Sequence, residues 1–233
     1  MLLQATLHIY HEFHPEGLIK QPWNTYSSLV FFIPVIYWLY KLKGQYKTYW
    51  VVTSILPLLF LNGLGSTLFH ARNGGMAFMM LDVLPPLLML VFLTVFMWRQ
   101  SVKSYWVAGA VLLAFLSLNF GNMAYHSQIN QMARGVNIFY LINGTMVATP
   151  ILLWLAKRGW HGWQSIASAA TLIGLALIFR TLDYPTPNPF PEALPQGTHF
   201  LWHVTSALAV FPLGNFLMAV MQTSNSVERA KAS

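Results

Sequence analysis

Five side chains that could take part in catalysis lie in or at the ends of long apolar segments: Ser66, His70, Asp82, His199 and His203. A charged group inside a bilayer is costly, about 2.5–3.5 kcal/mol for a central aspartate, and usually marks a functional site. His199 and His203 are four residues apart, so a helix places both imidazoles on one face, and Ser66 and His70 share this spacing. Three histidines with a nearby carboxylate and hydroxyl are the components of a catalytic zinc centre, in which the ion keeps one position open.

Each of these residues also has a purely structural interpretation, which the sequence leaves open. The paired histidines could lie at the membrane interface and bond loop carbonyls. Asp82 could form an ion pair with Arg72 or Arg180 at the same end of the bundle. Ser66 could pack between helices and bond its own backbone, as serine does in many helices.

The composition identifies the class of protein. Of its 233 residues, 56% are hydrophobic and only 8% are charged, whereas soluble domains carry about 25% charged residues. The sequence therefore predicts a polytopic membrane protein, with residues 1–233 forming one domain. Cysteine is absent, so histidine and carboxylate side chains must supply any metal ligands. The formal charge of +7 comes from basic residues in short loops, which indicates membrane topology and argues against nucleic-acid binding.

Seven segments are long and apolar enough to span a bilayer, which takes about 20 residues. They predict an all-α membrane protein with a bundle of seven transmembrane helices. Residues 1–21 form an extramembrane N-terminal segment without the apolar core of a signal peptide, and residues 222–233 form a polar tail. The expected spans are Trp23–Tyr40, Tyr49–His70, Met76–Trp98, Tyr105–Gly121, Val136–Leu155, Trp163–Arg180 and Thr198–Met221.

The basic residues orient this bundle. Nine lie on the side of the loops after the first, third and fifth spans, and four lie on the opposite side. The positive-inside rule then places the N-terminus outside and the C-terminus in the cytoplasm, in a bacterial inner membrane or a eukaryotic endomembrane. In this topology the three histidines and Asp82 share the outer half of the bilayer. Tryptophans expected in the interfacial belts are Trp23, Trp98, Trp106, Trp160 and Trp163.

Four motifs resemble those of the alkaline ceramidase family, part of a superfamily of seven-helix hydrolases that includes the adiponectin and progestin receptors. Gly65–His70 is similar to its GSxxFH motif, Leu81–Pro85 to its LLDELP segment, and His199–His203 to its HxxWH motif. Trp23–Ser28 is similar to its WNTxSN motif. The match follows the family order over nearly the whole chain. The resemblance implies one zinc ion on His70, His199 and His203, assisted by Ser66 and Asp82.

The resemblance also implies an activity: zinc-dependent cleavage of the amide bond of a membrane lipid such as ceramide. Asp82 would accept the proton of the attacking water and pass it to the leaving amine. Ser66 would hydrogen-bond the water or the developing oxyanion. Two alternatives remain open, an ester-cleaving lipid hydrolase and a seven-helix lipid receptor or transporter with a structural metal.

The N-terminal segment departs from the family, whose acidic cluster binds calcium. Glutamine stands at position 21, near a family glutamate, and Glu12 and Glu16 are the only acids before the first span. This makes calcium doubtful, because calcium prefers several carboxylate oxygens. The simplest expectation for this segment is a solvated, partly flexible chain. Two alternatives are suggested by His8, His11 and His14. The segment could form a second metal site, or it could form a lid over the outer end of the bundle.

Overall fold

The computed structural model describes residues 10–183 and 186–232, and within these residues the chain forms helices joined by turns and irregular segments, with no strand. Within these described residues, six helices are long and apolar enough to cross a membrane. This supports the prediction of an all-α, multi-pass integral membrane protein. The six are α3 (Trp50–Arg72), α4 (Met76–Val102), α5 (Tyr105–Gln128), α6 (Met132–Ala156), α7 (Trp163–Thr181) and α8 (His199–Ala232).

Three shorter helical pieces occupy the first predicted span. They are α1 (Pro22–Ser28), the 3₁₀ turn η1 (Leu29–Phe31) and α2 (Phe32–Lys41), and they follow one another without a break. A 3₁₀ turn inside a helix shifts the direction of the side chains that follow it. Because each piece is shorter than a bilayer requires, the seven-span count stays a prediction, as does the orientation of the termini.

The chain divides into two compact units. Unit 1 comprises Met1–Pro86 and Gln164–Ser233, and unit 2 comprises Leu87–Trp163. The division falls inside α4, directly after the Pro85-Pro86 pair. All five residues singled out for catalysis belong to unit 1. The prediction of one domain over residues 1–233 stays a prediction.

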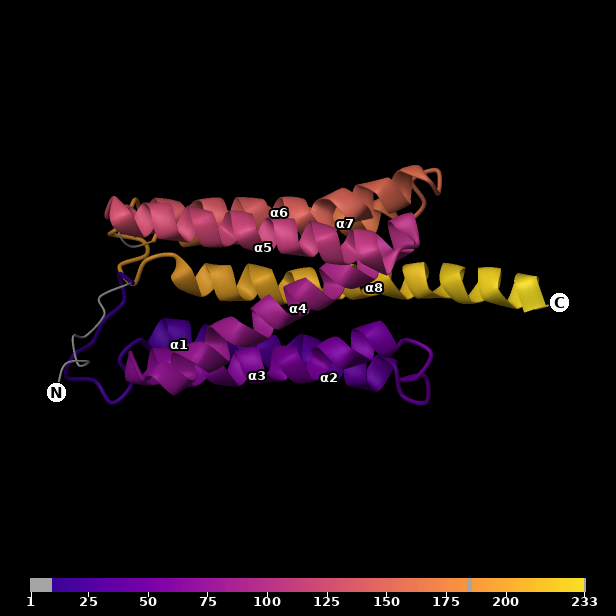
Figure 1. Ribbon diagram of the computed structural model, residues 1–233. Coiled ribbons are helices and arrows are strands. Elements are labelled where there is room, and N and C mark those ends of the chain that lie inside the picture. The colour runs from indigo at the N-terminus through magenta and orange to yellow at the C-terminus, as the bar shows by residue number, and fades with distance from the viewer. Residues whose placement is uncertain (1–9, 184–185, 233) are drawn as a thin grey trace. The chain divides into compact units, whose positions relative to one another are not determined.

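Unit 1 is organised around α3 and α8. Helices α1 and α2 pack on α3, and α8 packs on α1, α2 and α3 (Figure 1). Two glycines permit the closest approaches. A Cβ at Gly214 would lie 2.2 Å from the Trp38 ring, and one at Gly65 would lie 2.3 Å from the Leu81 carbonyl carbon. The close approach at Gly65 brings the start of α4 against α3.

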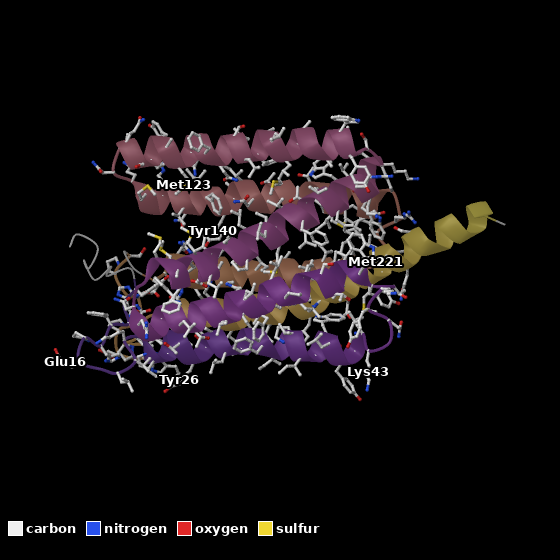
Figure 2. All side chains as sticks on the ribbon, turned by 60° about the horizontal axis from the view of Figure 1, so that its bottom comes forward. Glu16, Tyr26, Lys43, Met123, Tyr140 and Met221 are labelled. Carbon is white, nitrogen blue, oxygen red and sulfur yellow. The ribbon has the colours of Figure 1, made fainter. Side chains whose placement is uncertain are left out.

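Figure 2 shows which labelled residues lie at each end of unit 1: Glu16 and Tyr26 lie at one end, and Lys43 and Met221 lie at the other. Helix α8 continues past Met221 to Ala232, so the segment predicted as a cytoplasmic tail is helical over most of its length.

Unit 2 contains the second part of α4 with α5 and α6, and α5 and α6 pack side by side. The Asn119 amide donates to Asn143 across this contact at 3.0 Å. The prediction that Trp98 lies in an interfacial belt is wrong. Its ring is buried, and the indole N–H donates to the Met146 carbonyl at 3.3 Å. A buried tryptophan needs such a partner, and this one ties α4 to α6.

Candidate metal centre

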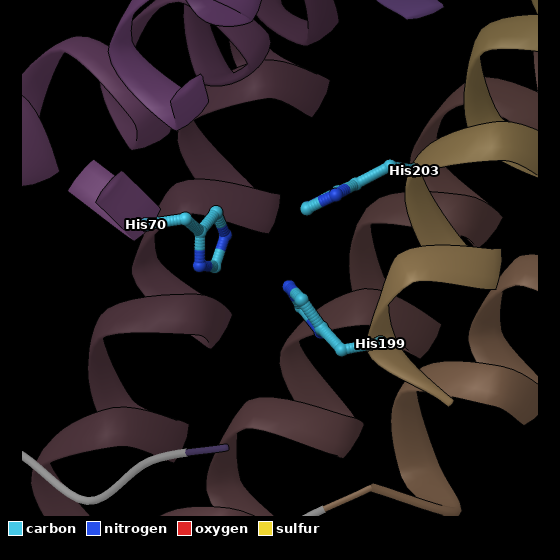
Figure 3. Close-up of side chains that lie close together, drawn as sticks. All are labelled: His70, His199 and His203. Carbon is cyan, nitrogen blue, oxygen red and sulfur yellow. The ribbon is translucent and has the colours of Figure 1, made fainter. Parts of the chain in front are cut away.

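Three histidines from two helices form a buried cluster. His70 comes from the end of α3, and His199 and His203 come from successive turns at the start of α8 (Figure 3). Their exposed fractions are 0%, 6% and 2%. Each offers one nitrogen, and these three nitrogens lie within 4.8 Å of one another. Three buried imidazoles at this separation are close enough to hold one metal ion.

Gln21 orients the ring of His70. The Gln21 carbonyl oxygen Oε1 accepts a hydrogen bond from the Asn24 amide at 3.1 Å and lies 2.6 Å from His70 Nδ1. The Gln21 amide group donates to Asn73. Because Oε1 can only accept, His70 Nδ1 must carry the proton, and the lone pair is on Nε2. His70 Nε2 is buried and has no hydrogen-bond partner. An orphaned buried nitrogen with a fixed tautomer is what a metal ligand requires.

Two serines of α1 orient the ring of His203 in the same way. The Ser27 hydroxyl donates to the Asn24 carbonyl at 3.1 Å and lies 2.8 Å from His203 Nδ1. Since its only proton is used on the carbonyl, the hydroxyl accepts from Nδ1–H, which leaves the Nε2 lone pair for a metal. The Ser28 hydroxyl lies 3.3 Å from the same Nδ1.

The N-terminal segment covers the cluster. The ring of Tyr10 lies 4.1 Å from that of His199 and 4.9 Å from that of His70, measured between centroids. The expectation of a solvated segment is therefore wrong for Tyr10–Phe13, which are buried or half-buried, and the lid alternative describes these residues. His8 lies outside the described residues. A lid of this kind excludes water, which strengthens electrostatic interactions beneath it.

Glu12 fixes this lid to α1. Its carboxylate accepts from the backbone N–H groups of Trp23 at 2.7 Å and Asn24 at 2.8 Å, and the side chain is 2% exposed. These are N–H groups that the first turn of a helix leaves without intrahelical partners, so Glu12 acts as a capping residue. Burial raises the pKa of the Glu12 carboxyl above its usual value, and the two N–H donors oppose this shift.

His11 makes a second attachment, to the segment between α7 and α8. The His11 backbone N–H donates to the Asp183 carboxylate at 3.1 Å, and His11 Nε2 lies 2.8 Å from the Thr186 carbonyl. A Cβ at Gly197 would lie 2.8 Å from both Asp183 Oδ1 and His11 Cβ, so glycine is needed here. Within the described residues, the histidine cluster above is the one group with metal-ligand spacing, and His11 serves as an anchor.

Asp82 and Ser66 form a polar pair between α3 and α4. The Ser66 hydroxyl hydrogen-bonds the Asp82 carboxylate. The Asn62 amide donates to the Asp82 carbonyl at 2.7 Å and to its Oδ1 at 3.2 Å. Ser66 also lies 3.0 Å from the Ser28 hydroxyl. A continuous set of polar contacts therefore runs from Asp82 through Ser66 and Ser28 to His203.

The sequence predicts that the three histidines lie together, but it does not predict the residues that hold them. In the sequence, Gln21 stands out only as a departure from the family pattern, and Ser27 and Ser28 stand out only as part of a motif. Their polar side chains lie on the short helix α1, which packs against α3 and α8, and the helix period alone does not show which of these two helices each side chain faces. Tyr10 carries no sequence signal of this role.

No family model matches this chain, and no curated protein matches it either. The function must therefore be argued from the geometry of the site.

Proposed function

We propose that this protein is a membrane-embedded, zinc-dependent hydrolase that cleaves the amide bond of a lipid. The observation that supports it best is the combination of two features in unit 1. One is the buried cluster of His70, His199 and His203, and the other is the Asp82–Ser66 pair connected to it through Ser28. A purely structural metal site needs no such carboxylate and hydroxyl beside it.

The donor set fits zinc. Three imidazole nitrogens suit borderline metals, and in catalytic zinc sites three protein ligands leave a position for substrate or water. His70 and His203 are held in one tautomer by Gln21 and Ser27, as metal-ligating histidines usually are. Zinc supplies Lewis acidity at such a site and makes water a stronger nucleophile near neutral pH.

Asp82 is the proposed proton carrier. Hydrolysis of an amide adds water across the C–N bond, so one proton must leave the water and one must reach the leaving nitrogen. Asp82 would take up the first and deliver the second, as a general base and then a general acid. The Ser66 hydroxyl, held by Asp82 and Ser28, would orient the water while Asp82 is ionised. Once Asp82 has taken up the water proton, the Ser66 proton would be free to turn to the carbonyl oxygen as charge develops on it.

The site's location favours a lipid substrate. The cluster lies at the end of helices apolar enough to cross a membrane, and Tyr10 covers it. A substrate whose acyl chain stays between helices could present its amide here without leaving the bilayer. The ceramide-like assignment rests on the motif resemblance described above.

Release of both products tests this function. Purified, zinc-loaded protein is incubated with ceramide and with an ester of the same fatty acid, and fatty acid and amine or alcohol are quantified by mass spectrometry. We expect fatty acid and long-chain amine in equal amounts from ceramide. Asp82→Asn should keep its zinc and lose about 10²–10⁴-fold in rate, while Glu192→Gln, at an exposed acid, should match wild type.

Three outcomes would contradict the proposal. Cleavage of the ester alone would indicate an ester hydrolase. If neither lipid is cleaved and one lipid is tightly bound per chain, the protein is a receptor or transporter. Normal activity in Asp82→Asn would remove Asp82 from the mechanism.

A further inference from the structure

Unit 2 contains a cavity of about 370 Å³ where α4 and α6 end. Its walls are residues 100–103 from the end of α4, with Trp154, Lys157 and Arg158 from the end of α6. Its volume lies within the usual range for small-molecule sites. It lies wholly within unit 2, and the function proposed above makes no use of it.

Three basic side chains line this cavity: Lys103, Lys157 and Arg158. Unit 2 has five basic residues and no aspartate or glutamate, so no carboxylate within the unit can neutralise them. Lys157 donates to the Ser101 carbonyl at 2.7 Å, and this bond connects α6 to α4 across the cavity. A lysine side chain often serves only to bond the last carbonyls of a nearby helix C-terminus, and Lys157 does this at the end of α4.

The other two cations are not explained in that way. In the described part of the chain, neither Lys103 nor Arg158 donates a side-chain hydrogen bond to a carbonyl or forms an ion pair. The Arg158 guanidinium instead lies 5.4 Å from the centre of the Trp154 ring, which holds it at the wall of the cavity. Two uncompensated cations facing one cavity attract an anion, and the five N–H groups of arginine suit phosphate oxygens.

Exposed aromatic rings place this cavity at the depth of lipid head groups. Tyr105 and Trp106, which follow Lys103, are 70% and 91% exposed. Trp160 and Trp163, which follow Arg158, are each 51% exposed. Such rings are costly in water but are enriched at the membrane–water interface. The anions found at this depth are those of the lipid head groups at the membrane surface.

We propose that this cavity binds the phosphate of an anionic phospholipid head group. Basic pockets at helix ends are a known means of selecting such lipids. The lipid's phosphate would pair with Lys103 and Arg158, while its acyl chains would remain in the bilayer. Binding at this place would stabilise unit 2 by the usual linkage between ligand affinity and stability.

The test compares two variants with the same change in charge. Lys103→Gln/Arg158→Gln removes the two cations and keeps the Lys157–Ser101 bond. Lys43→Gln/Lys47→Gln removes two lysines from the loop between α2 and α3, on the side predicted to face the cytoplasm as well. Delipidated protein is titrated with phosphatidylglycerol and with phosphatidylcholine of the same acyl chains, and bound lipid is counted by native mass spectrometry.

Wild type should bind phosphatidylglycerol more tightly than phosphatidylcholine. Because each basic residue near an anionic lipid strengthens binding about fivefold, Lys103→Gln/Arg158→Gln should bind phosphatidylglycerol about 25-fold more weakly. Lys43→Gln/Lys47→Gln should keep wild-type affinity. Equal weakening in both variants would show a general effect of surface charge and overturn the proposal. Displacement of phosphatidylglycerol by inorganic phosphate at similar concentration would overturn the lipid assignment, because the site would then select a soluble anion.

Discussion

Gly65→Ala is the change that isolates the contribution of the α3–α4 contact. A Cβ at residue 65 would lie 2.3 Å from the Leu81 carbonyl carbon and 2.5 Å from the Asp82 nitrogen. Ordinary van der Waals contact begins near 3.4 Å, so the two backbones must separate by about 1 Å. The bond from the Asn62 amide to the Asp82 carbonyl would then lengthen from 2.7 Å to about 3.7 Å, which breaks it.

Two consequences follow from this shift. Forcing a methyl group into a packed contact should cost about 1–3 kcal/mol in the free energy of unfolding. Displacing Asp82 by about 1 Å should lower the hydrolytic rate on the order of 100-fold. Zinc content should stay at the wild-type level, because the three histidines come from α3 and α8 and none comes from α4.

The assay measures zinc by elemental analysis, thermal unfolding and ceramide turnover in the same preparations. Gly174→Ala in α7 is the matched control, since its new Cβ would meet nothing within 4 Å. This control should be as stable as wild type or more so, because alanine favours a helix by about 1 kcal/mol over glycine. Wild-type stability and turnover in Gly65→Ala would refute the close contact, and loss of zinc would show that the contact supports the histidines instead of Asp82.

Three further predictions concern the ends of the bundle. Burial raises the pKa of Glu12 from its usual 4.5, so the stability of wild type relative to Glu12→Gln should be greatest below pH 4.5 and should fall as pH rises through the folded-state pKa. A difference in melting temperature between the two proteins that does not change with pH would contradict this. Added calcium should not change the rate of hydrolysis by the zinc-restored protein, because both Glu12 oxygens already accept hydrogen bonds from backbone N–H groups and are not available to bind calcium. Strong activation by calcium would refute this role of Glu12. A cysteine at Lys43 should be labelled only from the cytoplasmic side and one at Glu192 only from outside; labelling at Glu192 from the cytoplasm would invert the topology.

The histidine cluster could be predicted from the sequence because its signals are local. The spacing of His199 and His203 sets their shared helix face, and the apolar segments set the depth of both helix ends. The same logic identified Ser66 as a neighbour of His70 along α3. These inferences need only the period of a helix and the thickness of a bilayer.

The residues around the cluster could not be predicted in this way. Tyr10 and Glu12 reach the site through an irregular segment, whose path depends on the helix N-terminus that Glu12 caps. Ser27 reaches His203 from a short helix that ends in a 3₁₀ turn. Trp98 was misplaced because its position near a helix end resembles an interfacial one, whereas its partner Met146 is 48 residues away in sequence. Long-range partners of this kind leave no local pattern.

The zinc content of His203→Ala tests the central claim most directly. Wild-type protein should contain about one zinc ion per chain, and His203→Ala should lose most of it, because removing one of three protein ligands leaves the ion weakly held. His161→Ala is the control, since His161 is exposed, and its Nδ1 lies 2.7 Å from the Arg158 carbonyl in unit 2. We expect the full zinc content in His161→Ala and little zinc in His203→Ala. Equal zinc in the two variants would contradict it.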